Sequence, residues 1–142
     1  MVRIELLSWD RARAAATLIR CKVFVEEQRV PPDIEMDEND AQCVHALALV
    51  ASGGAIGTGR LLPDGHIGRM AVLREWRGRG VGGLILEKLI ERARRRGDPA
   101  VVLSAQTHAI GFYRGHAFFE EGGVYEEAGI PHQMMRRSLR GL

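Results

Sequence analysis

Cysteine is scarce in this sequence. The 142 residues contain only Cys21 and Cys43, and these two do not form a C-x-x-C motif. Two isolated cysteines in a chain of this length are typical of small buried side chains in a reducing compartment, so we expect no disulfide bond. The five histidines do not share a metal-ligand spacing with them, and we therefore predict that no metal is bound.

Long hydrophobic runs are also missing. Charged residues interrupt every apolar stretch, so the sequence predicts no membrane-spanning helix. The first residues, MVRIELLSWDRAR, contain no apolar signal core followed by a small-residue cleavage site. These absences argue against a membrane partner and lead us to expect a cytoplasmic protein.

The sequence carries little net charge. Its 20 basic and 18 acidic side chains give a formal charge of +2, which is too small to predict binding to nucleic acid. The most basic stretch, ERARRR over residues 91–96, ends a predicted helix, where cations suit the helix dipole and face water. We expect no nucleic-acid partner, and whether Arg92–Arg96 contact a cofactor phosphate stays open.

The chain is predicted to fold as one α/β domain (an α+β mixed sheet) over residues 1–142. No internal repeat, low-complexity tract or linker divides it, and 46% hydrophobic residues suffice for one core. Apolar segments bounded by glycine and proline predict strands, and helical periodicity predicts helices, in the order β-α-β-β-β-α-β-α-β-β. The strands are expected at residues 2–7, 45–51, 55–62, 66–73, 100–105, 117–129 and 131–139, and the helices at 9–28, 79–96 and 107–116.

A glycine-rich segment, RGRGVGG over residues 77–83, stands at the start of the second predicted helix. Its glycines fit the spacing G-x-G-x-x-G, which occurs in nucleotide-binding loops. A Walker-type loop would end in G-K-[ST], but Leu84 follows Gly83. A dinucleotide-binding fold would place an acid at the end of the next strand, whereas Asp98 precedes that strand. Both of these nucleotide sites are therefore disfavoured.

The same segment also fits the pattern [QR]-x-x-G-x-[GA], through Arg77, Gly80 and Gly82. The first N–H groups of a helix have no intrahelical partner and the helix dipole adds positive charge, so this terminus suits a diphosphate. Glycines let the ligand approach the backbone, and Arg77 and Arg79 would add ionic contacts. A helix start without a ligand is the alternative. Each glycine inside a helix costs about 0.5–1 kcal/mol relative to alanine, which favours a function for the loop.

Taken in order, these motifs resemble the GNAT superfamily of acetyl-CoA-dependent acyltransferases. Residues 68–97 resemble its strand–loop–helix signature for coenzyme A, and residues 101–119 resemble its second motif, Asn-x-x-Ala-x-x-x-Tyr followed by Gly-Phe. The segments that resemble the small bacterial ElaA/YjcF-like branch are residues 19–40, 57–72 and 125–135. The sequence departs from the general pattern at Gln106, where many members have asparagine, and at Ala117, where glycine is usual. The longer amide can still form hydrogen bonds, whereas the alanine predicts a differently shaped turn.

The resemblance implies a GNAT-like sheet with a splayed central strand pair, and acetyl-CoA as cosubstrate. The main chain of Met70, Ala71 and Val72 would pair with the pantetheine arm, and an N–H near Val72 would polarise the thioester carbonyl. Tyr113 would protonate the leaving thiolate. The implied activity is acetyl transfer, within a ternary complex, to an amine of a small-molecule or peptide acceptor. The implied cofactor-binding residues are Met70, Ala71, Val72, Arg77, Gly78, Arg79, Gly80, Val81, Gly82, Gly83, Gln106 and Tyr113.

The residue that accepts the proton of the amine is left open by the sequence. The candidates are Glu27, Glu35, Asp37, Glu127 and His132. The catalytic set is taken as Tyr113, Val72 and Glu127, and the acceptor-binding set as Arg20, Glu27 and His132. Arg20 can alternatively pair with the acids of residues 33–40.

Other interpretations are open at this stage. The patterns R-x-x-V-F, from Arg20 to Phe24, and E-x-D-x-x-D, from Glu35 to Asp40, also resemble acyl-homoserine-lactone synthases, which are longer proteins. A non-catalytic module that binds CoA would keep the same loop without turnover. Edge strands without a partner also leave a homodimer open.

Overall fold

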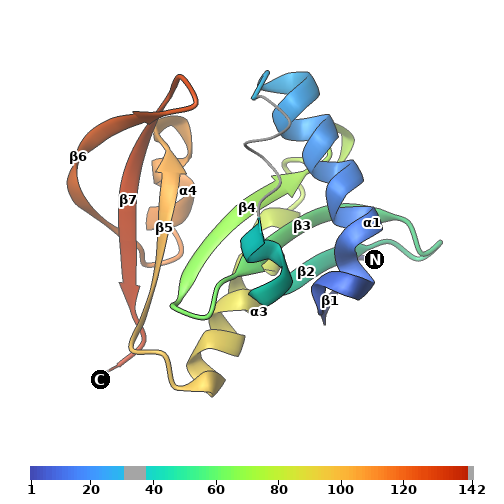
Figure 1. The fold of residues 1–142 in the computed structure, drawn as a ribbon, viewed down its shortest axis with the longest axis horizontal. Coiled ribbons are helices and arrows are strands. Elements are labelled where there is room, and N and C mark those ends of the chain that lie inside the picture. The colour runs from blue at the N-terminus through green and yellow to red at the C-terminus, as the bar shows by residue number, and fades with distance from the viewer. Residues whose placement is uncertain (31–37, 141–142) are drawn as a thin grey trace.

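The computed structural model describes residues 1–30 and 38–140, which form a mixed seven-stranded sheet with helices on both faces (Figure 1). The strands lie in the order β1-β2-β3-β4-β5-β7-β6. The strands are β1 (Arg3–Leu7), β2 (Val44–Leu49), β3 (Ala55–Leu61), β4 (His66–Val72), β5 (Ala100–Gln106), β6 (Phe119–Glu127) and β7 (Ile130–Ser138). The helices are α1 (Trp9–Arg20), α3 (Val81–Arg96), α4 (Ile110–Arg114), η1 (Cys21–Glu27), η2 (Glu38–Gln42), η3 (Arg74–Trp76) and η4 (Thr107–Ala109). The predicted order of strands and helices is confirmed.

Helices α1 and α3 cover opposite faces of the N-terminal half of the sheet (Figure 1). Successive side chains of a strand point to opposite faces, and β2 shows this alternation. Leu47 and Leu49 pack against α1. Ala46 and Ala48 belong to the core on the other face, to which α3 contributes buried side chains such as Ile85.

The sheet opens between β4 and β5. These parallel strands are paired at only two consecutive positions, His66 and Ile67 of β4, and Figure 1 shows them diverging from that end. An irregularity follows in β4, where Arg69 has a left-handed φ of 50° and the register against β3 shifts. Such irregularities bend a strand, and the predicted splayed strand pair is confirmed.

The helix predicted over residues 9–28 is continuous, but its hydrogen bonding changes along its length. α1 ends at Arg20 and continues directly as the π-helix η1. The N–H of Gln28, for example, donates to the carbonyl of Val23, five residues earlier, at 3.1 Å. Single π turns inside helices are frequent at functional sites, and η1 borders the opening between β4 and β5.

The second predicted helix begins two residues later than expected. Gly80 has a φ of 81°, which an α-helix does not allow, so α3 starts at Val81. The predicted end of this helix is confirmed, because Gly97 follows with a φ of 90°.

Ala117 does not change the backbone conformation that glycine favours. It has a φ of 66°, in the left-handed region, and the following Phe118 is fully buried. The expected change in turn shape is therefore not seen at this residue. Alanine in this left-handed conformation instead lowers the stability of the fold by about 1–2 kcal/mol relative to an unstrained residue.

Candidate functional site

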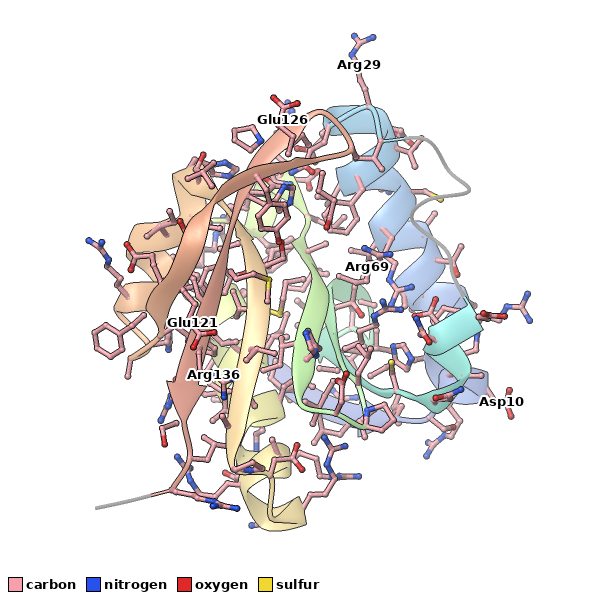
Figure 2. The ribbon with its side chains drawn as sticks, turned by 60° about the vertical axis from the view of Figure 1, so that its left-hand side comes forward. Asp10, Arg29, Arg69, Glu121, Glu126 and Arg136 are labelled. Carbon is pink, nitrogen blue, oxygen red and sulfur yellow. The ribbon has the colours of Figure 1, made fainter. Side chains whose placement is uncertain are left out.

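The divergence of β4 and β5 leaves a cleft of about 630 Å³, a size typical of small-molecule sites. β4, the loop before α3, β5, α4 and the β6–β7 hairpin all line this cleft. Arg29, just after η1, and Glu126, near the hairpin tip, lie at the same end of the molecule (Figure 2). The predicted cofactor-binding residues that line the cleft are Met70, Ala71, Val72, Arg77, Gly78, Gly80, Val81, Gly82, Gly83, Gln106 and Tyr113.

The end of β4 presents main-chain groups to this cleft. The N–H of Leu73 donates to the carbonyl of Ile56, at the β3 side, at 2.9 Å. Because adjacent residues of a strand direct their main-chain groups to opposite edges, the N–H and C=O of Val72 face the other edge. Val72 is thus positioned to donate a hydrogen bond into the cleft.

Two glycines of the loop before α3 are required by their backbone conformation. Gly78 and Gly80 have φ values of 77° and 81°, which L-residues rarely adopt. A Cβ atom added at either position would meet no atom within 4 Å. The first intrahelical bond of α3 runs from the N–H of Leu84 to the carbonyl of Gly80, so the N–H groups before it have no helical acceptor.

Glycine is needed at position 83 for a different reason, which is close packing. A Cβ atom there would lie 3.2 Å from Nε2 of His116, which is tighter than ordinary van der Waals contact. Nδ1 of His116 lies 2.6 Å from a carboxylate oxygen of Glu87 on α3. Gly83 therefore lets the segment after α4 pack closely on α3, a role that the sequence pattern did not predict.

Arg77 is held by protein groups. Its Nη1 and Nη2 donate to the two carboxylate oxygens of Glu27, both at 2.9 Å, and its Nε donates to the carbonyl of Val72 at 2.9 Å. The hydrogen bonds from Arg77 hold the pKa of Glu27 below its usual value. The guanidinium of Arg79 lies over the ring of Trp76, 4.9 Å from its centroid, and Arg79 does not line the cleft.

Tyr113 lines the cleft from α4. Its ring makes edge contacts with Phe112 and Phe118, at centroid distances of 5.0 and 6.0 Å. Burial raises the pKa of Tyr113 to about 12. The phenol is therefore protonated at neutral pH, as a proton donor must be.

Polar side chains gather at the hairpin end of the cleft. Gln28 and Gln106 join their amides across it, with N–O distances of 2.9 and 3.4 Å. His132 is 7% exposed and lines the cleft, with Nδ1 2.7 Å from the carbonyl oxygen of Ile130. Glu127 also lines the cleft but is exposed.

Three residues at this end were missed by the sequence interpretation. Gln28 pairs with Gln106, and Tyr125 stacks on His132 while its hydroxyl is hydrogen-bonded to Ser104. The signal in the sequence was the dipeptide Ala128–Gly129, which forms a two-residue hairpin turn with positive φ at both residues. The length of a hairpin turn fixes the register of its strands, and this register places Tyr125 opposite His132.

The remaining predicted site residues lie elsewhere. Arg20 is fully buried, does not line the cleft, and donates to Asp40 at 2.8 Å. Asp40 also accepts from Arg60 at 2.9 Å; although burial acts to raise the pKa of Asp40, the two arginines lower it. Of the two alternatives for Arg20, the ion pair with an acid of residues 33–40 is the one observed. Glu35 and Asp37 lie outside the described residues.

Within residues 1–30 and 38–140, no group of three or more His, Cys, Asp or Glu side chains could hold a metal ion. In the part of the chain that the structure describes, no helix is both long and apolar enough to cross a membrane. Cys21 and Cys43 do not form a disulfide bond with each other, and the thiol of Cys43 donates to the carbonyl of Asn39 at 3.1 Å.

Similarity to known proteins agrees with this geometry. Residues 14–139 match the family described as the acetyltransferase (GNAT) domain. The chain is 36% identical to YjcF of Bacillus subtilis, named an uncharacterized N-acetyltransferase, over 85% of this chain and 89% of YjcF. It is also 36% identical to the protein ElaA of Escherichia coli, over 85% of this chain and 84% of ElaA.

Solved structures share the whole fold. The crystal structure of Escherichia coli ElaA has a TM-score of 0.87 at 30% identity, covering 97% of this chain and 100% of ElaA. An acyl-CoA N-acyltransferase from Pseudomonas aeruginosa has a TM-score of 0.85 at 29% identity, covering 97% of this chain and 100% of that one. The fold is that of an acyltransferase. The chain belongs to the GNAT family of N-acetyltransferases, and the predicted similarity to its ElaA/YjcF-like branch is confirmed.

Proposed function

We propose that this protein transfers the acetyl group of acetyl-CoA directly to an amine, with both substrates bound in the cleft between β4 and β5. One observation carries the proposal: the free edge of β4, the glycine loop before α3 and Tyr113 all line the same cleft. A strand edge, an anion-binding helix start and a protonated phenol are the groups that a thioester with a diphosphate tail requires.

The residues present fit coenzyme A. The open space at Gly78 and Gly80 leaves room for a diphosphate beside the N–H groups that begin α3. The unpaired edge of β4 after Ile67 would bind the pantetheine amides as an added strand. Since Arg77 is engaged by Glu27 and Val72, we assign it to shaping the loop, and the diphosphate to the main chain.

The chemical step uses two groups of this chain. The N–H of Val72 would stabilise the oxyanion that forms when the amine attacks the thioester, and one such donor is worth about 2.7–4 kcal/mol. Tyr113 would protonate the departing thiolate. Because a thiol of pKa about 8.5 already leaves readily, the oxyanion donor contributes more than the acid.

The acceptor is proposed to be an amine of a small molecule or peptide that enters at the hairpin end. There Gln28, Gln106 and His132 provide polar side chains that can form hydrogen bonds with an acceptor. The exposed carboxylate of Glu127 at the same end favours an acceptor that is cationic in solution.

Two measurements on the full chain test the proposal. Isothermal titration with acetyl-CoA is expected to show one site, and release of free thiol is expected with at least one member of a panel of polyamines, amino sugars, amino acids and lysine peptides. Absence of acetyl-CoA binding contradicts the proposal. Binding without thiol release would indicate a non-catalytic module, and turnover that requires S-adenosylmethionine would indicate a homoserine-lactone synthase.

A further inference from the structure

The imidazole of His132 has a defined tautomer. Its Nδ1 lies 2.7 Å from the carbonyl oxygen of Ile130, two residues earlier on the same strand. A carbonyl oxygen only accepts hydrogen bonds, so Nδ1 carries the proton and donates it. In the neutral ring, Nε2 therefore holds a lone pair.

That nitrogen is accessible from the cleft. His132 is 7% exposed and belongs to the cleft lining. Among the described residues no hydrogen bond engages Nε2, and the atom is not sealed from solvent. A neutral imidazole nitrogen open to a substrate cleft is the group that most often accepts protons in enzymes near neutral pH.

The ring is also held in place. Tyr125 lies directly opposite His132 in the β6–β7 register, and the two rings stack with centroids 6.1 Å apart and planes 25° from parallel. The hydroxyl of Tyr125 is hydrogen-bonded to Ser104 of β5 and lies 3.3 Å from the sulfur of Met134. Three strands thus fix the orientation of the imidazole, which a base needs if its nitrogen is to meet the acceptor.

The described carboxylates are less suited to the task. Both oxygens of Glu27 are bound by Arg77, and Glu27 does not line the cleft. Glu127 is exposed at the end of β6, where water competes for its oxygens. The titratable groups near His132 are Tyr125 and Glu127 of β6 and His108 of η4, a segment that contacts β7 and lines the cleft. β5 presents the uncharged Gln106 and Ser104.

We propose that Nε2 of His132 is the general base of the acetyl transfer, an inference that rests on the proposed function. As the neutral amine forms its bond to the thioester carbon, its proton passes to Nε2. The carbon–sulfur bond then breaks, and the thiolate takes the proton of Tyr113. The imidazolium returns a proton to the phenolate through water, so the products are an amide and a free thiol. An acceptor that enters as an ammonium ion first releases one further proton to solvent.

The variant His132→Gln tests this role. It keeps a side chain of similar reach but removes the base, so kcat is expected to fall by about 10²–10⁴-fold, with acetyl-CoA affinity by calorimetry unchanged. The acidic limb of kcat/KM against pH is expected to disappear. His66→Gln, at an exposed histidine outside the cleft lining, is the matched control and keeps wild-type rates. A loss of less than about tenfold in kcat, or an unchanged acidic limb, overturns the proposal.

Two further measurements do not depend on that variant. In His132→Ala, added imidazole is expected to restore part of the lost rate in proportion to its unprotonated fraction. In wild-type protein labelled with ¹⁵N-histidine, NMR is expected to show the Nδ1–H tautomer for His132, and an Nε2–H tautomer overturns the proposal even if no variant folds. Failure of the proposed function is distinct, because wild-type protein itself would then release no thiol with any amine.

Discussion

Glu27 and Arg77 form a bidentate ion pair that joins η1 to the loop before α3, with both N–O distances at 2.9 Å. Arg77 also donates to the carbonyl of Val72 at the end of β4. The guanidinium of Arg77 thus connects η1, the end of β4 and the glycine loop before α3. The pair lies partly in solvent, with side-chain exposures of 21% for Glu27 and 42% for Arg77, so its contribution is expected mainly in positioning.

Glu27→Gln is expected to weaken acetyl-CoA binding modestly. Loss of the Glu27 carboxylate frees the guanidinium of Arg77 and loosens the glycine loop. Because a partly exposed ion pair contributes at most about 1 kcal/mol, the Kd for acetyl-CoA should rise about two- to fivefold, as measured by calorimetry. Glu121→Gln is the control, since Glu121 pairs with Arg136 at 2.9 Å on the exposed side of β6 and β7 (Figure 2). Equal effects of the two variants would contradict a positioning role.

The same pair predicts a pH dependence of stability. Arg77 holds the pKa of Glu27 below its usual value of 4.5, so the carboxylate stabilises the fold at neutral pH and this contribution is lost as the pH falls through the lowered pKa. The difference in unfolding free energy between wild type and Glu27→Gln, from urea titrations, should therefore shrink below pH 4.5. A difference that grows on acidification would contradict the ion pair.

Tyr113→Phe is expected to slow the reaction without abolishing it. The variant removes the proton donor for sulfur, and kcat should fall by about 10- to 100-fold because the thiol is already a fair leaving group. Acetyl-CoA affinity should stay unchanged. Since the pKa of Tyr113 is raised to about 12, the wild-type rate should show no decline from loss of this proton up to pH about 10. An unchanged kcat in the variant would remove Tyr113 from the mechanism.

Gly80→Ala and Gly97→Ala separate backbone strain from ligand contact. Both glycines have positive φ, 81° and 90°, and an added Cβ meets no protein atom within 4 Å at either site. Each variant should lose about 1 kcal/mol of unfolding free energy. Only Gly80→Ala, in the cleft, should weaken acetyl-CoA binding, by about tenfold or more. Equal affinity of the two variants would argue against a diphosphate at the start of α3.

Ala117→Gly is expected to stabilise the protein. The left-handed φ of 66° at Ala117 destabilises the fold by about 1–2 kcal/mol when the residue is not glycine. Glycine removes this strain, but its greater conformational entropy in the unfolded state offsets about half of the stabilisation. A net increase of about 0.5–1 kcal/mol in unfolding free energy should appear in urea titrations. Ala14→Gly, on the exposed side of α1, should change stability by a similar amount in the opposite direction. A loss of stability in Ala117→Gly would show that the side chain contributes more than the strain costs.

The order of strands and helices was predictable because each element depends on the local periodicity of apolar residues and on the glycines and prolines that end it. The predicted start of α3 was wrong by two residues, because the left-handed φ of Gly80 cannot be predicted from the amino-acid sequence alone. The π-helical hydrogen bonding of η1 was not predicted either, because the few residues of a π turn are too short a segment for their periodicity to be told from that of an α-helix. The roles assigned to Tyr113, Val72 and the glycine loop stay predictions, and so does a homodimer through an edge strand.

By itself the sequence determined which segments become strands and helices, that a glycine-rich segment containing arginine leads into a helix, and which family the motifs resemble, because these properties depend on neighbours along the chain. Only the tertiary structure decided that Arg77 is bound by Glu27, 50 residues away, and that Tyr125 and Ser104 hold His132. Such partners come together through strand register and through the angle at which β4 and β5 diverge, and both are set by packing across the whole sheet.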